Sequence, residues 1–345
     1  MTSTSLSWPE ALAAMNACIC AYQIRRVTTV HSEQAPILRS ETRGNGDEAF
    51  VYDVMPVFQD AVGFRALSET YTPDFEACGT DDIDAALVGA LSRDRAVLAL
   101  RGTLSPNLVR NDCAGWIRDW LQDAEAKPEP WSVGDQGTDE AETGFATAVM
   151  RLWPWIERKL APRVASLSGG LVITGHSKGG AMTFLVASLV REKWPDLPIV
   201  VYAFAPPVAG NSAFARAYAA SGLTDVTHRI QVIRDAVPYL PRWDRADIWA
   251  ALKPSGVLER VGWDVLARLA HDLTGKGYTA VGDVVVITDS QGSVSYGIEA
   301  VRASLTAIAT ALEAKEYEAV ASAHSSVSSY LRMIKTAARK AGNDG

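Results

Sequence analysis

Residues 175–179 read Gly-His-Ser-Lys-Gly, a G-x-S-x-G pentapeptide set between a strand-like and a helix-like segment. Upstream, residues 170–174 are mostly apolar and β-branched, which is typical of a buried parallel strand. Downstream, apolar residues recur with helical spacing between Gly180 and Trp194. Because the turn between them is tight, only glycine fits two positions before and two after the serine. The pattern predicts a strand–turn–helix unit that holds Ser177 as a nucleophile at the carboxyl end of a sheet.

Strand-like and helix-like segments alternate along the rest of the chain. Strands are predicted at residues 49–57, 63–68, 95–101, 170–174, 197–204, 228–234 and 279–288. Helices are predicted at residues 7–23, 144–160, 180–194, 296–323 and 325–341, with Ser7 as the N-cap of the first. This alternation favours a mostly parallel sheet with helices on both faces.

Composition excludes several classes of function. A chain of 345 residues, 48% of them hydrophobic, can bury a substantial core. The net charge of −7 disfavours a nucleic-acid partner, and without a run of about 18 apolar residues no transmembrane segment is predicted. No two of the four cysteines have zinc-site spacing near histidines, so we expect no metal. Residues 1–9 lack a secretory signal pattern, so we expect a cytoplasmic protein or one exported without a visible signal peptide.

A nucleophilic serine needs a base, and the base needs an orienting acid. In α/β-hydrolases the acid and then the histidine follow the serine along the chain. His31 lies too early in the chain, and His176 lies beside the serine. His228 comes just ahead of a predicted strand, and His271 lies in a helical segment. His324 comes last, between two predicted helices, where a loop can return it to Ser177.

Asp235 is the candidate acid because it directly follows the predicted strand 229–234. A carboxylate there lies on the same edge of the sheet as Ser177. Alone, Asp235 also fits an Asx turn before Pro238, and His324 also fits a histidine packed between two helices. Their order and their place at the edge of the sheet together favour catalysis.

Thr103 ends another predicted strand after Gly102. Its hydroxyl and N–H, together with the N–H of Lys178, are candidate donors to the oxyanion of a tetrahedral intermediate. The alternative is a simple Gly-Thr turn.

These motifs together resemble the class 3 lipases, the fungal-lipase-like family of α/β-hydrolases. The resemblance covers about residues 97–330 and rests on Leu-Arg-Gly-Thr at 100–103, Thr-Gly-Phe at 143–145, the elbow at 175–180, Phe-Ala-Pro-Pro-Val-Ala-Gly-Asn at 204–211, Arg-Asp-x-Val-Pro at 234–238, and His324 with Tyr330. It implies an α/β-hydrolase fold over residues 1–345 as a single domain, with a helical insertion at 243–276 before the catalytic histidine. It assigns Ser177, Asp235 and His324 as nucleophile, acid and base, and Thr103 and Lys178 to the oxyanion hole. No cofactor is implied.

The elbow departs from the family at Lys178, where leucine is usual. The backbone N–H of residue 178 is still a donor with lysine in place of leucine. The Lys178 ammonium either attracts anionic head groups or extends into water.

A lid is expected within residues 104–142, where lipases of this family carry one. Trp116, Ile117, Trp120 and Leu121 form one apolar stripe at helical spacing. The alternative is a surface helix packed on the core.

The resemblance implies a serine hydrolase of lipid esters, a triacylglycerol lipase or carboxylesterase, in transient contact with a lipid interface. Phospholipase A1 is the nearest alternative, including an antibacterial lipase effector. A non-catalytic α/β-hydrolase-like binding protein is the alternative from another class.

Overall fold

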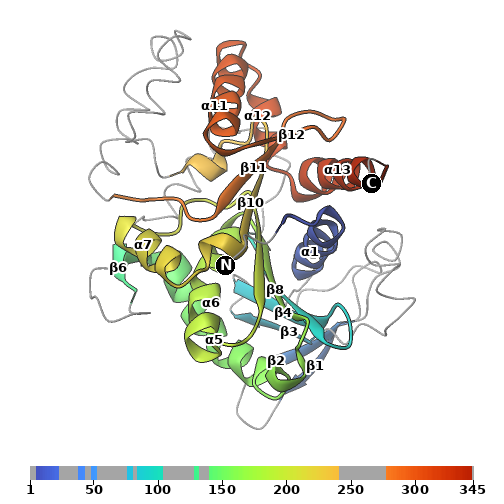
Figure 1. The fold of residues 1–345 in the computed structure, drawn as a ribbon, viewed down its shortest axis with the longest axis vertical. Helices are drawn as coiled ribbons and strands as arrows, with labels where there is room; N and C mark the ends of the chain where they lie inside the picture. Colours follow the sequence, from blue (N-terminus) through green and yellow to red (C-terminus); the bar gives the residue numbers. More distant parts are fainter. Residues whose placement is uncertain are drawn as a thin grey trace.

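The computed structural model describes residues 5–22, 38–42, 48–52, 76–80, 84–103, 128–131, 140–240 and 277–343. Its centre is a ten-stranded sheet with the order β1-β2-β3-β4-β5-β8-β9-β10-β11-β12 (Figure 1). The strands are β1 (Leu38–Thr42), β2 (Glu48–Tyr52), β3 (Glu76–Thr80), β4 (Asp84–Ala90), β5 (Arg95–Leu100), β8 (Gly170–His176), β9 (Ile199–Phe204), β10 (Thr227–Val232), β11 (Asp283–Ile287) and β12 (Val294–Tyr296).

The five strands from β5 to β11 run parallel and form the middle of the sheet, as the alternating pattern predicts. Strands β1 to β4 extend it antiparallel on one side, and β12 closes the other side antiparallel to β11. β8 and β9 are buried along their whole length, because a parallel strand is covered on both faces. The carboxyl ends of β5, β8, β9 and β10 therefore share one edge of the sheet.

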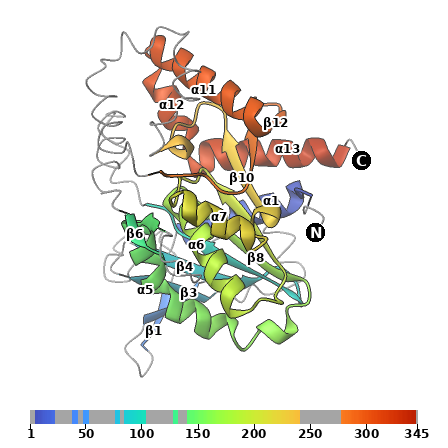
Figure 2. The same ribbon diagram turned by 60° about the vertical axis from the view of Figure 1, so that its left-hand side comes forward.

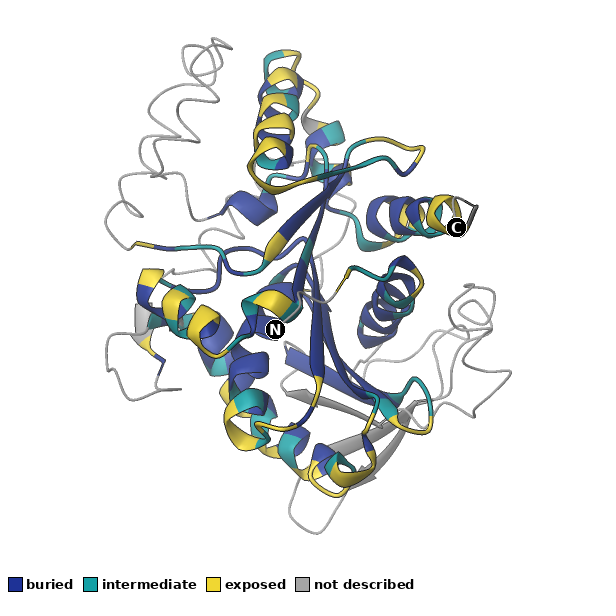
Figure 3. Cartoon of the chain, viewed as in Figure 1, coloured by how far each residue is buried: buried dark blue, intermediate teal, exposed yellow. Residues whose placement is uncertain are grey.

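Helices cover both faces of the sheet (Figures 1 and 2). The α-helices are α1 (Trp8–Ala21), α5 (Thr143–Leu160), α6 (Lys178–Lys193), α7 (Ser212–Ala220), α11 (Gly297–Glu313), α12 (Tyr317–Ala323) and α13 (Arg332–Asn343), and the short 3-10 helices are η2 (Val164–Ser166), η3 (Thr224–Val226) and η4 (Val237–Tyr239). α5, α6 and α7 share one apolar core with one face of the sheet. α1 and α13 share a second core with the opposite face. The buried parts of the strands lie between these two layers (Figure 3).

α1 begins where the sequence predicts. The Ser7 hydroxyl accepts a hydrogen bond from the N–H of Glu10 at 3.4 Å, as an N-cap does. The carboxylate of Glu10 does not complete a capping box, because it binds Arg95 and accepts a hydrogen bond from Tyr202 instead. Almost every residue of α1 is buried, so this helix is a core element rather than an amphipathic surface helix.

The predicted helix 296–323 is divided in two. α11 ends at Glu313 and α12 begins at Tyr317, with Lys315 between them in the left-handed region at φ 59°. The next predicted helix also changes form, because a π-helical turn, η6 (Ser326–Leu331), precedes α13. His324 caps the end of α12, between this division and the π-helical turn.

Most of the predicted lid region 104–142 lies outside the described residues, including Trp116, Ile117, Trp120 and Leu121. What is described there is a two-stranded sheet of β6 (Pro128–Pro130) and β7 (Glu140–Glu142). The predicted insertion 243–276, with His271, also lies outside. None of the described helices has the length and apolarity that crossing a membrane requires.

Candidate active site

Ser177 occupies a strained turn between β8 and α6. Its backbone has φ 60° and ψ −129°, which a non-glycine residue rarely adopts. Its N–H donates to the carbonyl of Phe204 on β9 at 2.9 Å. A Cβ on Gly175 would lie 2.2 Å from the Gly179 carbonyl oxygen, and a Cβ on Gly179 would lie 2.2 Å from the Leu100 carbonyl oxygen. Both glycines of the pentapeptide are therefore required by the close approach of the backbone.

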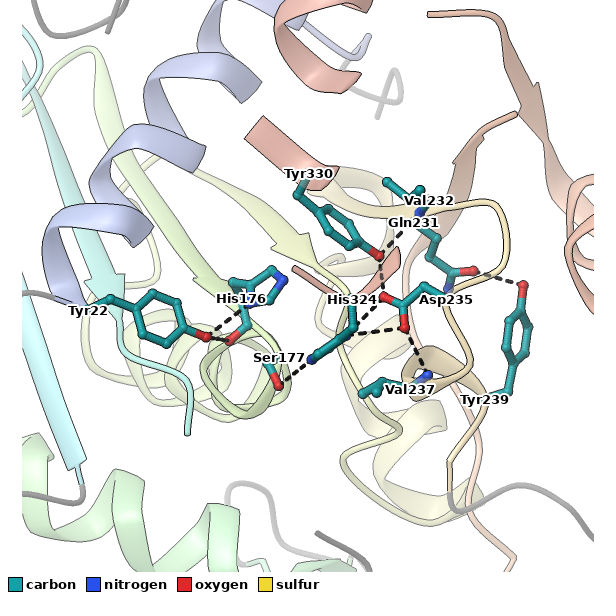
Figure 4. A network of polar contacts seen from close by, with 10 residues as sticks. All are labelled: Tyr22, His176, Ser177, Gln231, Val232, Asp235, Val237, Tyr239, His324 and Tyr330. Atoms are coloured by element: carbon teal, nitrogen blue, oxygen red, sulfur yellow. Dashed lines mark hydrogen bonds and ion pairs between the residues drawn. The ribbon is translucent and has the colours of Figure 1, made fainter. Parts of the chain in front are cut away.

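The three residues predicted as nucleophile, base and acid lie in one hydrogen-bonded chain (Figure 4). The Oγ of Ser177 is 2.9 Å from Nε2 of His324. Nδ1 of His324 is 3.0 Å from Oδ2 and 3.1 Å from Oδ1 of Asp235. All three side chains are buried. With His324 neutral, Nδ1–H donates to Asp235 and Nε2 accepts the proton of Ser177, which is the arrangement a general base needs.

Asp235 is held by two further donors. The hydroxyl of Tyr330 donates to Oδ2 at 2.6 Å, and the N–H of Val237 donates to Oδ1 at 3.0 Å. The N–H of Val232 donates in turn to the Tyr330 hydroxyl, so the tyrosine links the end of β10 to the acid. Burial and the neighbouring Asp235 carboxylate raise the pKa of Tyr330 well above its usual value, so the phenol stays a donor at neutral pH. Asp235 comes three residues after the end of β10, following Arg234 in a left-handed turn.

His176 is turned toward α1 rather than into the catalytic chain. Its Nδ1 is 2.9 Å from the hydroxyl of Tyr22, and its ring centroid is 4.9 Å from that of His324 (Figure 4). Burial, and then the charge that His324 can carry, lower the pKa of His176 well below its usual value. A neutral ring therefore packs beside the base without competing for its proton.

The predicted oxyanion residues flank Ser177. Thr103 is exposed just beyond the end of β5, and Lys178 is the first residue of α6, where N–H groups lack intrahelical acceptors. Both expectations for the Lys178 ammonium are wrong. It neither extends into water nor faces outward as a free cation, because its Nζ lies 2.6 Å from Oδ1 of the buried Asp84. The lysine side chain therefore ends at Asp84, the first residue of β4.

Tyr22 and Asp84 are the contacts that sequence reasoning missed. Both residues lie far from Ser177 along the chain and contact its neighbours, His176 and Lys178, only through packing. A carboxylate at the start of the apolar run 84–90 was the one available signal for Asp84. Among the described residues, no group of three or more His, Cys, Asp or Glu side chains is placed to hold a metal ion.

Residues 97–245 match the model of the class 3 lipase family. The matched segment covers less than half of the chain and is similar to the class 3 lipases. It is 29% identical over 179 residues to the secreted mono- and diacylglycerol lipase A of Penicillium cyclopium, an alignment that covers 51% of this chain and 53% of that protein. The chain therefore spans about half the length of the curated relatives it matches.

Solved lipase structures have the same fold as this chain. A mutant MDLA of Penicillium cyclopium superposes with a TM-score of 0.51 at 21% identity, over 89% of this chain and 91% of that one. Lipase II of Rhizopus niveus superposes with a TM-score of 0.52 at 15% identity, over 84% of each chain. At these identities the likeness concerns the α/β-hydrolase fold alone.

Proposed function

We propose that this protein is a class 3 lipase that hydrolyses carboxylic esters of lipids through Ser177, His324 and Asp235. The observation that carries the proposal is the continuous path of hydrogen bonds from Ser177 Oγ through the His324 ring to Asp235, on a strained elbow. A buried serine with a positioned base and a held acid is the arrangement that acyl transfer requires.

In the proposed reaction, Nε2 of His324 takes the proton of Ser177 as Oγ attacks the ester carbonyl carbon. The carbonyl oxygen becomes an oxyanion that accepts hydrogen bonds from Thr103 and the N–H of Lys178. The intermediate collapses, and the alkoxide leaves as an alcohol with the proton held on Nε2. Water, deprotonated by His324, then attacks the acyl-enzyme. The carboxylic acid is released as the proton returns to Ser177.

Two observations favour neutral lipid esters as substrates. The related protein of Penicillium cyclopium is described as a mono- and diacylglycerol lipase. In addition, the Lys178 ammonium is bound to Asp84, so it is not a free cation for a phosphate head group. That contact removes the sequence feature that had favoured phospholipase A1.

The test is a substrate panel with purified protein. It includes p-nitrophenyl esters of increasing chain length, emulsified mono- and diacylglycerols, and phosphatidylcholine with the released acyl position identified. We expect glycerides and long-chain esters to be hydrolysed faster than phosphatidylcholine, and folded Ser177→Ala to lose all of these activities. A wild type that binds the esters without turnover would instead be a binding protein.

We further propose that the protein acts outside the cytoplasm, because the relatives' descriptions call them secreted lipases. Fractionation of the producing cells tests this, and recovery of the protein from the cytoplasm alone would contradict it.

A further inference from the structure

The side chain of Lys178, the residue after Ser177, is bound to Asp84 on β4, the strand on the other side of β5 from β8. Nζ of Lys178 donates to Oδ1 of Asp84 at 2.6 Å, and the two side chains are only 16% and 4% exposed. A partly buried lysine–carboxylate contact of this length is a charge-assisted hydrogen bond with a preferred direction.

Asp84 also lies beside the strand end that carries Thr103. β4 runs antiparallel to β5 with Ala86 opposite Leu100, and the N–H of Arg101 donates to the carbonyl of Ala85 at 2.9 Å. Continuing this register by one residue would place Asp84 opposite Gly102. The ion pair therefore connects the first residue of α6 to the sheet beside Thr103, and so joins the two sides of the oxyanion site.

We propose that Asp84 is a positioning residue that acts through Lys178 to aim the N–H of Lys178 at the oxyanion. The inference rests on the ester hydrolysis proposed above.

Stability alone is a weak explanation for the pair. Removing two charges from water costs several kcal/mol, and an apolar pair of similar volume is often as stable. What an apolar side chain does not supply is a directional anchor. Gly179 already fixes how closely α6 approaches Leu100, and the ion pair fixes the orientation of the residue just before it.

The expected effect is on the chemical step. A donor that is present but misdirected stabilises the oxyanion less, whereas complete loss of an oxyanion donor costs about 10²- to 10³-fold in kcat. We therefore expect about a tenfold loss of kcat when the anchor is removed, with KM nearly unchanged.

The experiment compares Asp84→Asn, Lys178→Met and the double variant with wild type. The substrate is soluble p-nitrophenyl butyrate, and the second readout is inhibition by a trifluoromethyl ketone, which forms a tetrahedral adduct with the serine. Each single variant should lose about tenfold in kcat and in inhibitor affinity, and the double variant should be no worse, because the pair acts as a unit. Asp84→Glu should recover part of the loss.

The control is the Lys193–Glu157 pair at the opposite end of α6, where the contact is 2.8 Å and exposed. Glu157→Gln should leave kcat and inhibition unchanged.

Three results would overturn the proposal: single variants within about twofold of wild type, losses that multiply in the double variant, or an effect confined to KM. If Asp84→Asn does not fold, the double variant decides, because it leaves no buried charge unpaired. Inactive wild-type protein would refute the proposed function instead.

Discussion

At the residue scale, the proposed acid is held by three hydrogen-bond donors. Asp235 accepts hydrogen bonds from the His324 ring, the Tyr330 hydroxyl and the Val237 N–H. His324 in turn relies on Asp235 for its orientation. Changes around Asp235 should therefore reach the nucleophile through the tilt of the imidazole.

We expect Tyr330→Phe to lower stability and activity together. The change leaves one oxygen of Asp235 and the Val232 N–H with a lost partner, which costs about 1–3 kcal/mol. Urea unfolding and kcat/KM on p-nitrophenyl butyrate measure the two effects. Tyr296→Phe is the matched control, since Tyr296 is 57% exposed. Equal behaviour of the two variants would show that the hydroxyl of Tyr330 has no such role.

We expect His324→Gln to lower kcat/KM by about 10³-fold or more, because a triad without its base loses most of its rate. His228→Gln should not do so, since His228 lies on β10 against Tyr202, away from the catalytic chain. Steady-state kinetics of both variants decide the matter. An inactive His228→Gln beside an active His324→Gln would reverse the assignment.

The sequence predicted these residues where order along the chain carries the information. Ser177, Asp235 and His324 each follow or interrupt a regular segment, so strand ends and chain order selected them as candidates, and the structure brings the three side chains into contact. Neither strand ends nor chain order select Tyr22 or Asp84. Their roles depend on α1 and β4 packing against the elbow, and single-sequence periodicity contains no information about that packing.

At the scale of elements, the elbow is defined by backbone contacts between β8, α6 and β5. The two glycines of the pentapeptide were predictable because a tight turn forbids a Cβ there. The division between α11 and α12 was not predicted from the sequence. Ala314 and Lys315 are good helix formers, yet α11 ends in a Schellman motif: the N–H of Glu316 donates to the carbonyl of Ala311 at 2.8 Å, and Lys315 takes the left-handed conformation.

We expect Gly175→Ala to destabilise the protein by about 1–3 kcal/mol and to remove most activity, because its Cβ would collide with the backbone of Gly179. Gly342→Ala is the control at the end of α13, where an added Cβ would meet nothing within 4 Å. That variant should be neutral or slightly more stable. Thermal unfolding measures both, and a tolerated Gly175→Ala would show that the turn has room to relax.

At the scale of the whole molecule, two helical layers enclose a sheet that buries histidines in neutral form. His176 and His228 both have a pKa lowered mainly by burial, although Asp283 and Glu10 partly oppose the effect at His228. In the unfolded chain a histidine takes up its proton near pH 6.5. The unfolded state therefore binds more protons below that pH, and stability falls as the pH drops through it.

We expect the free energy of unfolding to decrease from pH 7.5 to 5.5, with each buried histidine contributing up to about 1.4 kcal/mol per pH unit. His228→Gln should show a shallower decrease than wild type. Urea titrations at several pH values measure the slopes. Identical slopes would mean that His228 is protonated as easily in the folded state as in the unfolded one.

Ser177 is proposed to be a nucleophile that His324 activates. The most direct measurement is labelling with a fluorophosphonate, followed by mass spectrometry of the proteolytic peptides. We expect one adduct per chain, located on Ser177, with ester hydrolysis lost in proportion to labelling and with far slower labelling of folded His324→Gln. An adduct on another residue, or a folded wild type that remains unlabelled, would contradict it.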